Sequence, residues 1–106
     1  MEDNASGDWM VLTVKGEVDL NTAPKLKERV NALIAQGHAN LVVDLEGVEF
    51  MDSTGLSALV SGLMRTNEAG GGMAVVCTRA QVLRLLALTG LDQVLKVHGS
   101  IAEAVA

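Results

Sequence analysis

The feature that most constrains the fold of this 106-residue chain is a repeated alternation of strand-like and helix-like segments. Residues 40–45, Asn-Leu-Val-Val-Asp-Leu, are almost continuously apolar, as expected of a strand covered on both faces. Leu56, Leu59, Val60 and Leu63 then follow at helical spacing. Strand–helix–strand order occurs three times, which predicts a small α/β domain: a mostly parallel sheet of about four strands with helices packed on it.

The predicted domain spans residues 9–106, and glycines end its three main helices, at Gly37, Gly70 and Gly90. Met1–Asp8 is polar and lacks the alternation of a strand. We therefore expect a flexible N-terminus with no strand in it. A short closing helix is expected after Ser100, which has capping-box spacing to a glutamate.

Composition argues against several classes of partner. The net charge is −5 and no basic run occurs, so neither nucleic acid nor an anionic membrane is an expected partner. Cys77 is the only cysteine and lies in an apolar run, which is typical of a buried side chain in a reducing compartment. His38 and His98 are isolated in the sequence, so no metal or cofactor is expected. No targeting segment opens the sequence, and we expect a cytoplasmic protein.

Parallel strands bring their following loops to one edge of the sheet, where α/β domains usually place their sites. Three such loops are predicted, at residues 19–22, 46–53 and 78–79. Asp19 and Ser53, distant in the sequence, are therefore expected on the same face of the domain.

The segment Met-Asp-Ser-Thr-Gly-Leu at residues 51–56 begins the second predicted helix. Asp52 or Ser53 can cap that helix, and the sequence does not decide between them. Enzyme motifs do not fit: Ser53 separates Asp52 from Thr-Gly, as no aspartic protease allows, and Met51 stands where a serine hydrolase elbow needs glycine. A phosphoacceptor needs no base of its own, and a helix N-terminus tolerates the added charge, so Ser53 is a candidate phosphoacceptor.

Three segments resemble the STAS domain of single-domain bacterial anti-sigma factor antagonists: Gly-Glu-Val-Asp-Leu-Asn-Thr-Ala at 16–23, residues 41–56, and the apolar run that ends at Cys77. The resemblance implies that the unphosphorylated protein binds an anti-sigma factor that is also a serine kinase, together with its nucleotide, and frees the sigma factor. It further implies that ATP-dependent phosphorylation of Ser53 releases the protein, and that a PP2C-type phosphatase resets it. Asp19 matches an aspartate that lies beside the acceptor.

The partner is then expected to contact the acceptor and its surroundings, namely Asp19, Asp52, Thr54, Gly55 and Leu56. Some alternatives stay open. Asp19 can serve the acceptor site, form a local turn, or do both. Gly55 can allow close approach of a partner or tight packing within the domain.

Alternatives also remain for the function as a whole. A STAS subunit of a sensor complex or lipid transporter need not be phosphorylated, and a small serine hydrolase using Ser53 is a third possibility. The antagonist is not an enzyme and is expected to be a monomer or weak dimer. Members of this family often begin with an additional strand, so the expected lack of one at Met1–Asp8 would shorten the first edge.

Overall fold

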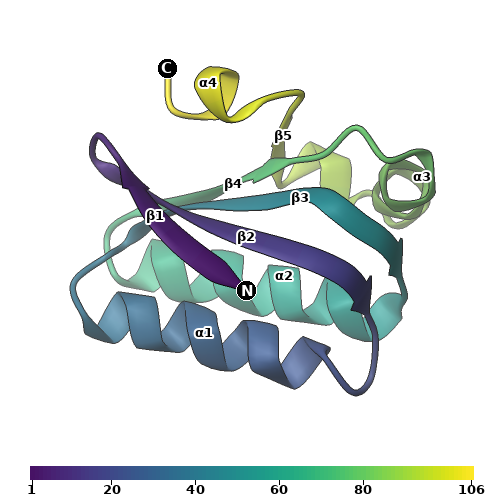
Figure 1. Ribbon diagram of the computed structural model, residues 1–106, viewed down its shortest axis with the longest axis horizontal. Coiled ribbons are helices and arrows are strands. Elements are labelled where there is room, and N and C mark those ends of the chain that lie inside the picture. Colours follow the sequence, from purple (N-terminus) through teal and green to yellow (C-terminus); the bar gives the residue numbers. More distant parts are fainter.

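A five-stranded sheet in sequence order forms the centre of the computed structural model, which describes residues 1–106 (Figure 1). The strands are β1 (Glu2–Ser6), β2 (Trp9–Val18), β3 (Asn40–Met51), β4 (Gly72–Val76) and β5 (Lys96–His98). The helices are α1 (Ala23–Ala35), α2 (Ser53–Glu68), α3 (Ala80–Thr89), the 3-10 turn η1 (Leu91–Gln93) and α4 (Ile101–Ala104). Strands β2 to β5 are parallel, which confirms the predicted α/β fold.

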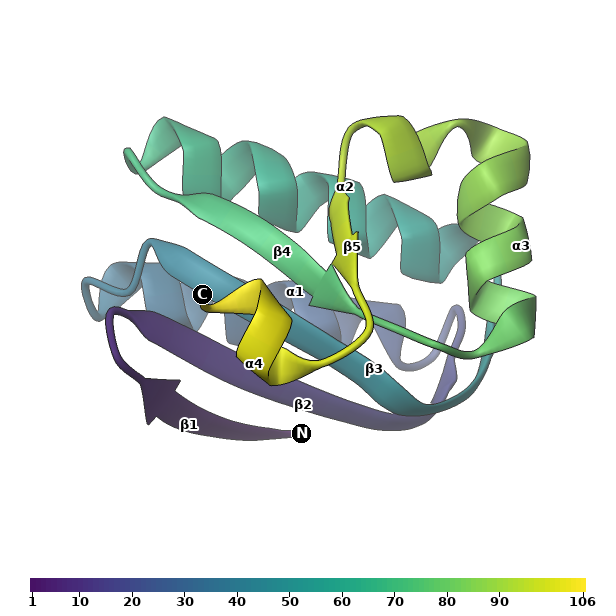
Figure 2. The ribbon, with the colours of Figure 1, turned by 90° about the horizontal axis from the view of Figure 1, so that it is seen from above.

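Two layers of helix cover the sheet unequally (Figures 1 and 2). Helices α1 and α2 lie side by side under one face, as successive right-handed crossovers in one direction require. The short helix α4 lies over the other face. Val43 of β3 belongs to the main core, which includes side chains of α1 and α2, while Val42 packs in a smaller cluster with Ala104. Burial on both faces explains the continuous apolar run in β3.

The prediction of a flexible N-terminus without a strand is wrong, and the sheet has five strands instead of four. Strand β1 pairs antiparallel with β2 through Gly7, whose φ of +59° suits a tight two-residue turn. Arg29 of α1 also holds β1, because its Nη2 lies 2.9 Å from Asp3 Oδ2 and donates to Met1 O at 3.1 Å. The strand is an edge held by backbone pairing and one ion pair, so its side chains carry no apolar alternation.

The predicted loop at residues 46–53 is also corrected. Strand β3 continues to Met51, pairing with β2 through two register shifts as far as Val18. Strand β4 ends earlier, with Val76 opposite Asp44. The last part of β3 therefore has a neighbouring strand on one side only, and only Asp52 remains between β3 and α2.

The predicted helix ends are confirmed at Gly37, Gly70 and Gly90, which all have positive φ just after a helix. Ser100 caps α4 by accepting a hydrogen bond from Glu103 N at 3.2 Å. None of the helices combines the length and the apolar character that crossing a membrane requires.

Candidate functional site

Asp52, and not Ser53, caps helix α2. Its backbone is extended, and its Oδ1 accepts hydrogen bonds from Thr54 N at 2.9 Å and Gly55 N at 3.2 Å. The Thr54 hydroxyl donates to the same oxygen. The hydrogen bond from the Thr54 hydroxyl has the largest effect and lowers the pKa of Asp52. Burial opposes it, and the backbone N–H groups of Gly55 and Thr54 lower the pKa further. The cap is therefore satisfied by a carboxylate that stays ionised.

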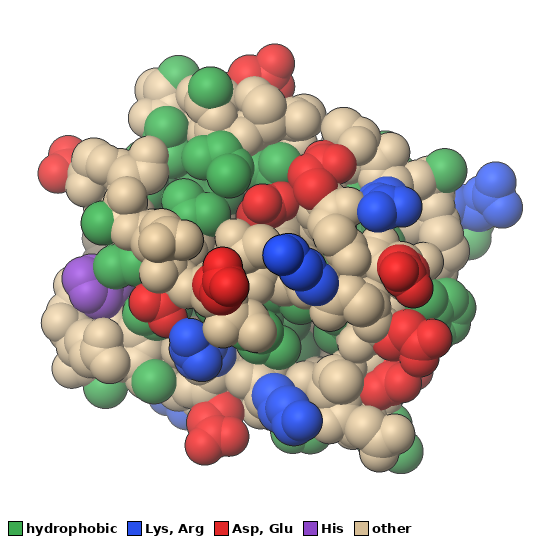
Figure 3. Space-filling model, in the orientation of Figure 1, with side chains coloured by type: hydrophobic (Ala, Val, Ile, Leu, Met, Phe, Trp, Pro, Cys, Tyr) green, Lys and Arg blue, Asp and Glu red, His purple; other side chains and the backbone are tan.

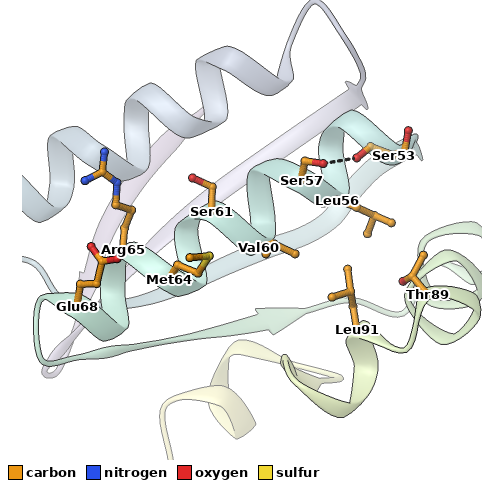
Figure 4. A pocket seen from close by; sticks show the side chains of 10 residues that line it. All are labelled: Ser53, Leu56, Ser57, Val60, Ser61, Met64, Arg65, Glu68, Thr89 and Leu91. Carbon is orange, nitrogen blue, oxygen red and sulfur yellow. Dashed lines mark hydrogen bonds between the residues drawn. The ribbon is translucent and has the colours of Figure 1, made fainter.

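The Ser53 side chain is consequently free. Ser53 is the first residue of α2 and is exposed, and its hydroxyl makes no hydrogen bond within the chain. Its backbone carbonyl accepts from the Ser57 hydroxyl at 3.0 Å, one helical turn further on (Figure 4). A free hydroxyl at the positive end of a helix is open to a partner or to a reagent.

The strands bring Asp19 to the same edge as Asp52, as predicted. Val18 pairs with Met51, and Asp52 N donates to Val18 O at 3.2 Å. The Asp19 carboxylate forms a local turn, because its Oδ1 accepts from Asn21 N at 2.9 Å and Thr22 N at 3.2 Å. Asp19 thus forms the predicted local turn, and its side chain makes no hydrogen bond to Ser53.

Gly55 is a packing position inside the domain. A Cβ at this residue would lie 2.6 Å from Met51 Cγ and 2.8 Å from Val18 O. Leu56 is 5% exposed and belongs to the main core, although its edge reaches the surface beside Ser53. Of the residues expected to meet a partner, Asp19, Asp52 and Thr54 are half-buried, whereas Gly55 and Leu56 are buried.

An open groove of about 620 Å³ begins at Ser53 and follows α2 toward its C-terminus (Figure 4). Its other wall comes from the end of α3 and from η1. Leu56, Val60, Met64 and Leu91 give it apolar surface, and Met64 is 57% exposed. The residues that line the groove are Ser53, Leu56, Ser57, Val60, Ser61, Met64, Arg65, Glu68, Thr89 and Leu91.

Two features of this edge escaped prediction from the sequence. Leu20 lies in the turn between β2 and α1, is 73% exposed, and shares a shallow hollow with Thr54 and Ser57. An apolar residue within a polar turn was the available signal. The side chain of Gln81 forms two hydrogen bonds with the backbone of Met51, and no pattern in the sequence indicates them.

The charges on the surface do not form a basic patch on the face that Figure 3 shows. Lys and Arg side chains are interspersed there with Asp and Glu. The structure holds no group of three or more His, Cys, Asp or Glu side chains that could bind a metal ion. Cys77 is buried, as predicted, and burial raises the pKa of its thiol.

Comparison with known proteins gives consistent matches. The family model described as "STAS domain" matches residues 1–104. The chain is 33% identical over 86 residues to the anti-sigma-B factor antagonist of Bacillus subtilis, which covers 81% of the chain and 78% of that relative. It is 30% identical over 98 residues to the protein of the same name from Staphylococcus aureus, covering 92% and 91%.

A solved structure gives the same result. The crystal structure of an anti-sigma factor antagonist from Mycobacterium paratuberculosis superimposes with a TM-score of 0.89 at 31% identity. The match covers 98% of this chain and 88% of that one. The likeness therefore extends over the whole sheet and its helices, including the edge that carries Ser53.

Proposed function

The chain belongs to the STAS domain family, and from that premise we propose that it is a phosphorylation-switched anti-sigma factor antagonist acting in the cytoplasm. Its unphosphorylated form binds an anti-sigma factor that is also a serine kinase, and the sigma factor is freed. The kinase transfers the γ-phosphate of its bound ATP to Ser53, and the antagonist dissociates. A PP2C-type phosphatase removes the phosphate and restores the binding form.

The observation that carries this proposal is the division of roles between Asp52 and Ser53. Asp52 supplies the cap that starts α2, so the hydroxyl of Ser53 is exposed and has no structural hydrogen bond. No base within the chain contacts that hydroxyl, which argues against a hydrolase that activates its own serine. A kinase supplies the base and the phosphoryl donor itself, so a free hydroxyl is sufficient.

The surroundings of Ser53 suit a docked protein. Asp19, Asp52 and Thr54 offer polar contacts at one edge, and the exposed Leu20 lies in the hollow beside Thr54. Leu56 contributes to the floor of the groove and to the core beneath it. An apolar centre with a polar rim is the usual anatomy of such an interface. Gly55 contributes through close packing that sets the position of α2 against β2 and β3.

Affinity capture tests the proposal. Unphosphorylated protein is immobilised and exposed to lysate of the source organism with ADP, and captured proteins are identified. We expect a kinase-fold anti-sigma factor that stays bound in ADP and dissociates when ATP is added. Mass spectrometry should then find one phosphate on Ser53. The Ser53→Ala variant should capture the same kinase and keep it in ATP, while Ser57→Ala, which removes the neighbouring exposed hydroxyl, should behave like the wild type.

Other outcomes favour the alternatives. A stable partner that ignores ATP and leaves Ser53 unmodified would indicate a non-switched STAS subunit. Labelling of Ser53 by a fluorophosphonate probe would indicate a hydrolase. Phosphate on Thr54 or Ser57 in place of Ser53 would contradict the assignment of the acceptor.

A further inference from the structure

The end of strand β3 lacks a strand partner on one side. Pairing with β4 stops at Asp44, whereas pairing with β2 continues to Met51. An unpaired edge leaves backbone N–H and C=O groups that need other partners. Because this edge leads directly into Asp52 and Ser53, whatever pairs it also influences where the hydroxyl lies.

Side chains from the start of α3 take the place of the missing strand. Gln81 Oε1 accepts a hydrogen bond from Met51 N at 3.0 Å, and Gln81 Nε2 donates to Met51 O at 2.9 Å. Two residues earlier, Arg79 Nε donates to Glu46 O at 2.7 Å. A primary amide carries a carbonyl oxygen that accepts beside an NH2 group that donates, so Gln81 pairs with Met51 much as a peptide unit of a neighbouring strand would.

Met51 is therefore held from both sides. Its side chain is fully buried in the core, and its neighbour Asp52 donates its N–H to Val18 O on the β2 side. Gln81 holds the opposite side. The next two residues are the cap of α2 and the free hydroxyl, with no loop to absorb a displacement.

We propose that Gln81 is a positioning residue for Ser53: its amide replaces a strand partner at Met51 and so fixes the point from which the acceptor hydroxyl is presented. The proposal rests on the proposed function for its consequence, phosphoryl transfer to Ser53. Gln81 does not touch the reacting atoms. It acts through Met51 and Asp52.

The test compares Gln81→Ala with Arg84→Ala, a matched change on the same helix, where Arg84 is exposed and makes no hydrogen bond or ion pair. Amide hydrogen exchange followed by NMR is the first readout. Loss of the Gln81 amide should speed exchange of the Met51 N–H by about tenfold or more, with little change in the amides of α1. Gln81→Glu keeps the acceptor for Met51 N but loses the donor to Met51 O, so it should give an intermediate rate.

The second readout is phosphorylation of Ser53 by the kinase captured with the wild-type protein, in Mg-ATP. Gln81→Ala should lower kcat by about 10- to 100-fold, since small misplacement of a reacting group has effects of that size, while KM changes less than about threefold. Arg84→Ala should leave both constants as in the wild type. A Gln81→Ala variant with Met51 exchange and kcat within about twofold of the wild type would overturn the proposal.

The two proposals fail separately. If the wild type itself is not phosphorylated on Ser53, the proposed function fails, and the positioning role for that reaction fails with it. The exchange measurement still decides whether Gln81 holds Met51. If Ser53 is phosphorylated and Gln81→Ala and Arg84→Ala lower kcat equally, the proposed function stands and the positioning role of Gln81 is wrong.

Discussion

The turns that precede α1 and α2 use one device with different results. In each, an aspartate after a strand accepts backbone hydrogen bonds from the residues two and three positions later. Asp19 accepts from Asn21 and Thr22, and Asp52 accepts from Thr54 and Gly55. The residue directly after each aspartate is exposed, and it is Leu20 in the first turn and Ser53 in the second.

The two turns differ in where the helix begins. Helix α1 starts only after Thr22, whose hydroxyl donates to Glu17 O at 2.7 Å and accepts from Asp19 N at 2.9 Å. Helix α2 starts directly after Asp52, so Ser53 lies in its first turn. The same arrangement thus exposes an apolar side chain in the loop before α1 and a hydroxyl in the first turn of α2. Because Asp52 caps α2, the side chain of Ser53 has no capping role, whereas Leu20 provides exposed apolar surface.

The largest expected effect is on partner binding when charge is added at Ser53. Two like charges about 4 Å apart at an effective dielectric of about 20 repel by roughly 4 kcal/mol, so phosphate facing an acidic group of the partner can lower affinity about 1,000-fold. Ser53→Asp adds less charge and should weaken binding by a smaller factor. Isothermal titration calorimetry against the captured anti-sigma factor, with ADP present, measures both.

The Ser53→Ala variant separates binding from folding. Because Asp52 is the cap, the free energy of unfolding of this variant should lie within about 0.5 kcal/mol of the wild-type value, and the variant should bind the partner as tightly. If Ser53→Asp bound the partner as tightly as the wild type, charge at Ser53 would not control binding, and the second turn would have no switching role that the first turn lacks.

The next effect concerns stability at Gly55, the third residue after Asp52 and the counterpart of Thr22 in the first turn. Gly55→Ala places a methyl group against Met51 and the carbonyl of Val18, so it should lower the free energy of unfolding by about 1–3 kcal/mol. Ser57→Ala, an exposed change on the same helix, is the control and should alter it by less than about 0.5 kcal/mol. Equal stability of the two variants in urea would show that the fit at Gly55 is not tight.

The contrast between the turns also shows what a sequence can predict here. The parallel sheet followed from runs such as Leu41–Val43, because burial on both faces leaves a continuous apolar signal. Strand β1 left none, since a polar edge strand is held by backbone pairing and by Arg29. Asp52 and Ser53 are both good capping residues, so only the backbone geometry at the end of β3 could assign the cap.

The shared edge of Asp19 and Ser53 was predictable because parallel topology alone brings it about. The contact between Gln81 and Met51 was not predictable, because it depends on β3 extending beyond the end of β4. A polar residue early in a helix looks like solvent-exposed surface whether or not it pairs with a strand. Leu20 gave only a weak signal as an apolar residue in a polar turn, since a single exposed leucine is common on protein surfaces.

A smaller effect on binding tests Leu20. Its side chain is 73% exposed, so Leu20→Ala should change the free energy of unfolding by less than about 0.5 kcal/mol. If the turn before α1 is part of the interface, affinity for the anti-sigma factor should fall by about five- to tenfold, as for an apolar contact worth about 1 kcal/mol. Val94→Ala is the matched control, because Val94 is 61% exposed and lies before the amino end of β5, whereas Leu20 follows the carboxyl end of β2. Equal affinities of the two variants would remove Leu20 from the interface.

The smallest effect is on the acid stability of the second turn. The hydrogen bond from the Thr54 hydroxyl is the main reason why the pKa of Asp52 is below 3.8. A carboxylate with a lowered pKa in the folded state stabilises the fold above the pKa of the unfolded chain, and this contribution is lost as the pH falls through the folded-state value. Thr54→Val removes that hydroxyl, so the pKa of Asp52 should move upward, and the part of the stability lost on acidification below about pH 4 should become smaller. NMR titration of the Asp52 carboxyl carbon measures the shift directly, and urea unfolding between pH 3 and 5 measures its consequence. A Thr54→Val variant with an unchanged Asp52 pKa would mean that the backbone N–H groups of Thr54 and Gly55 hold the carboxylate by themselves, and the threonine hydroxyl would then have no part in leaving Ser53 free.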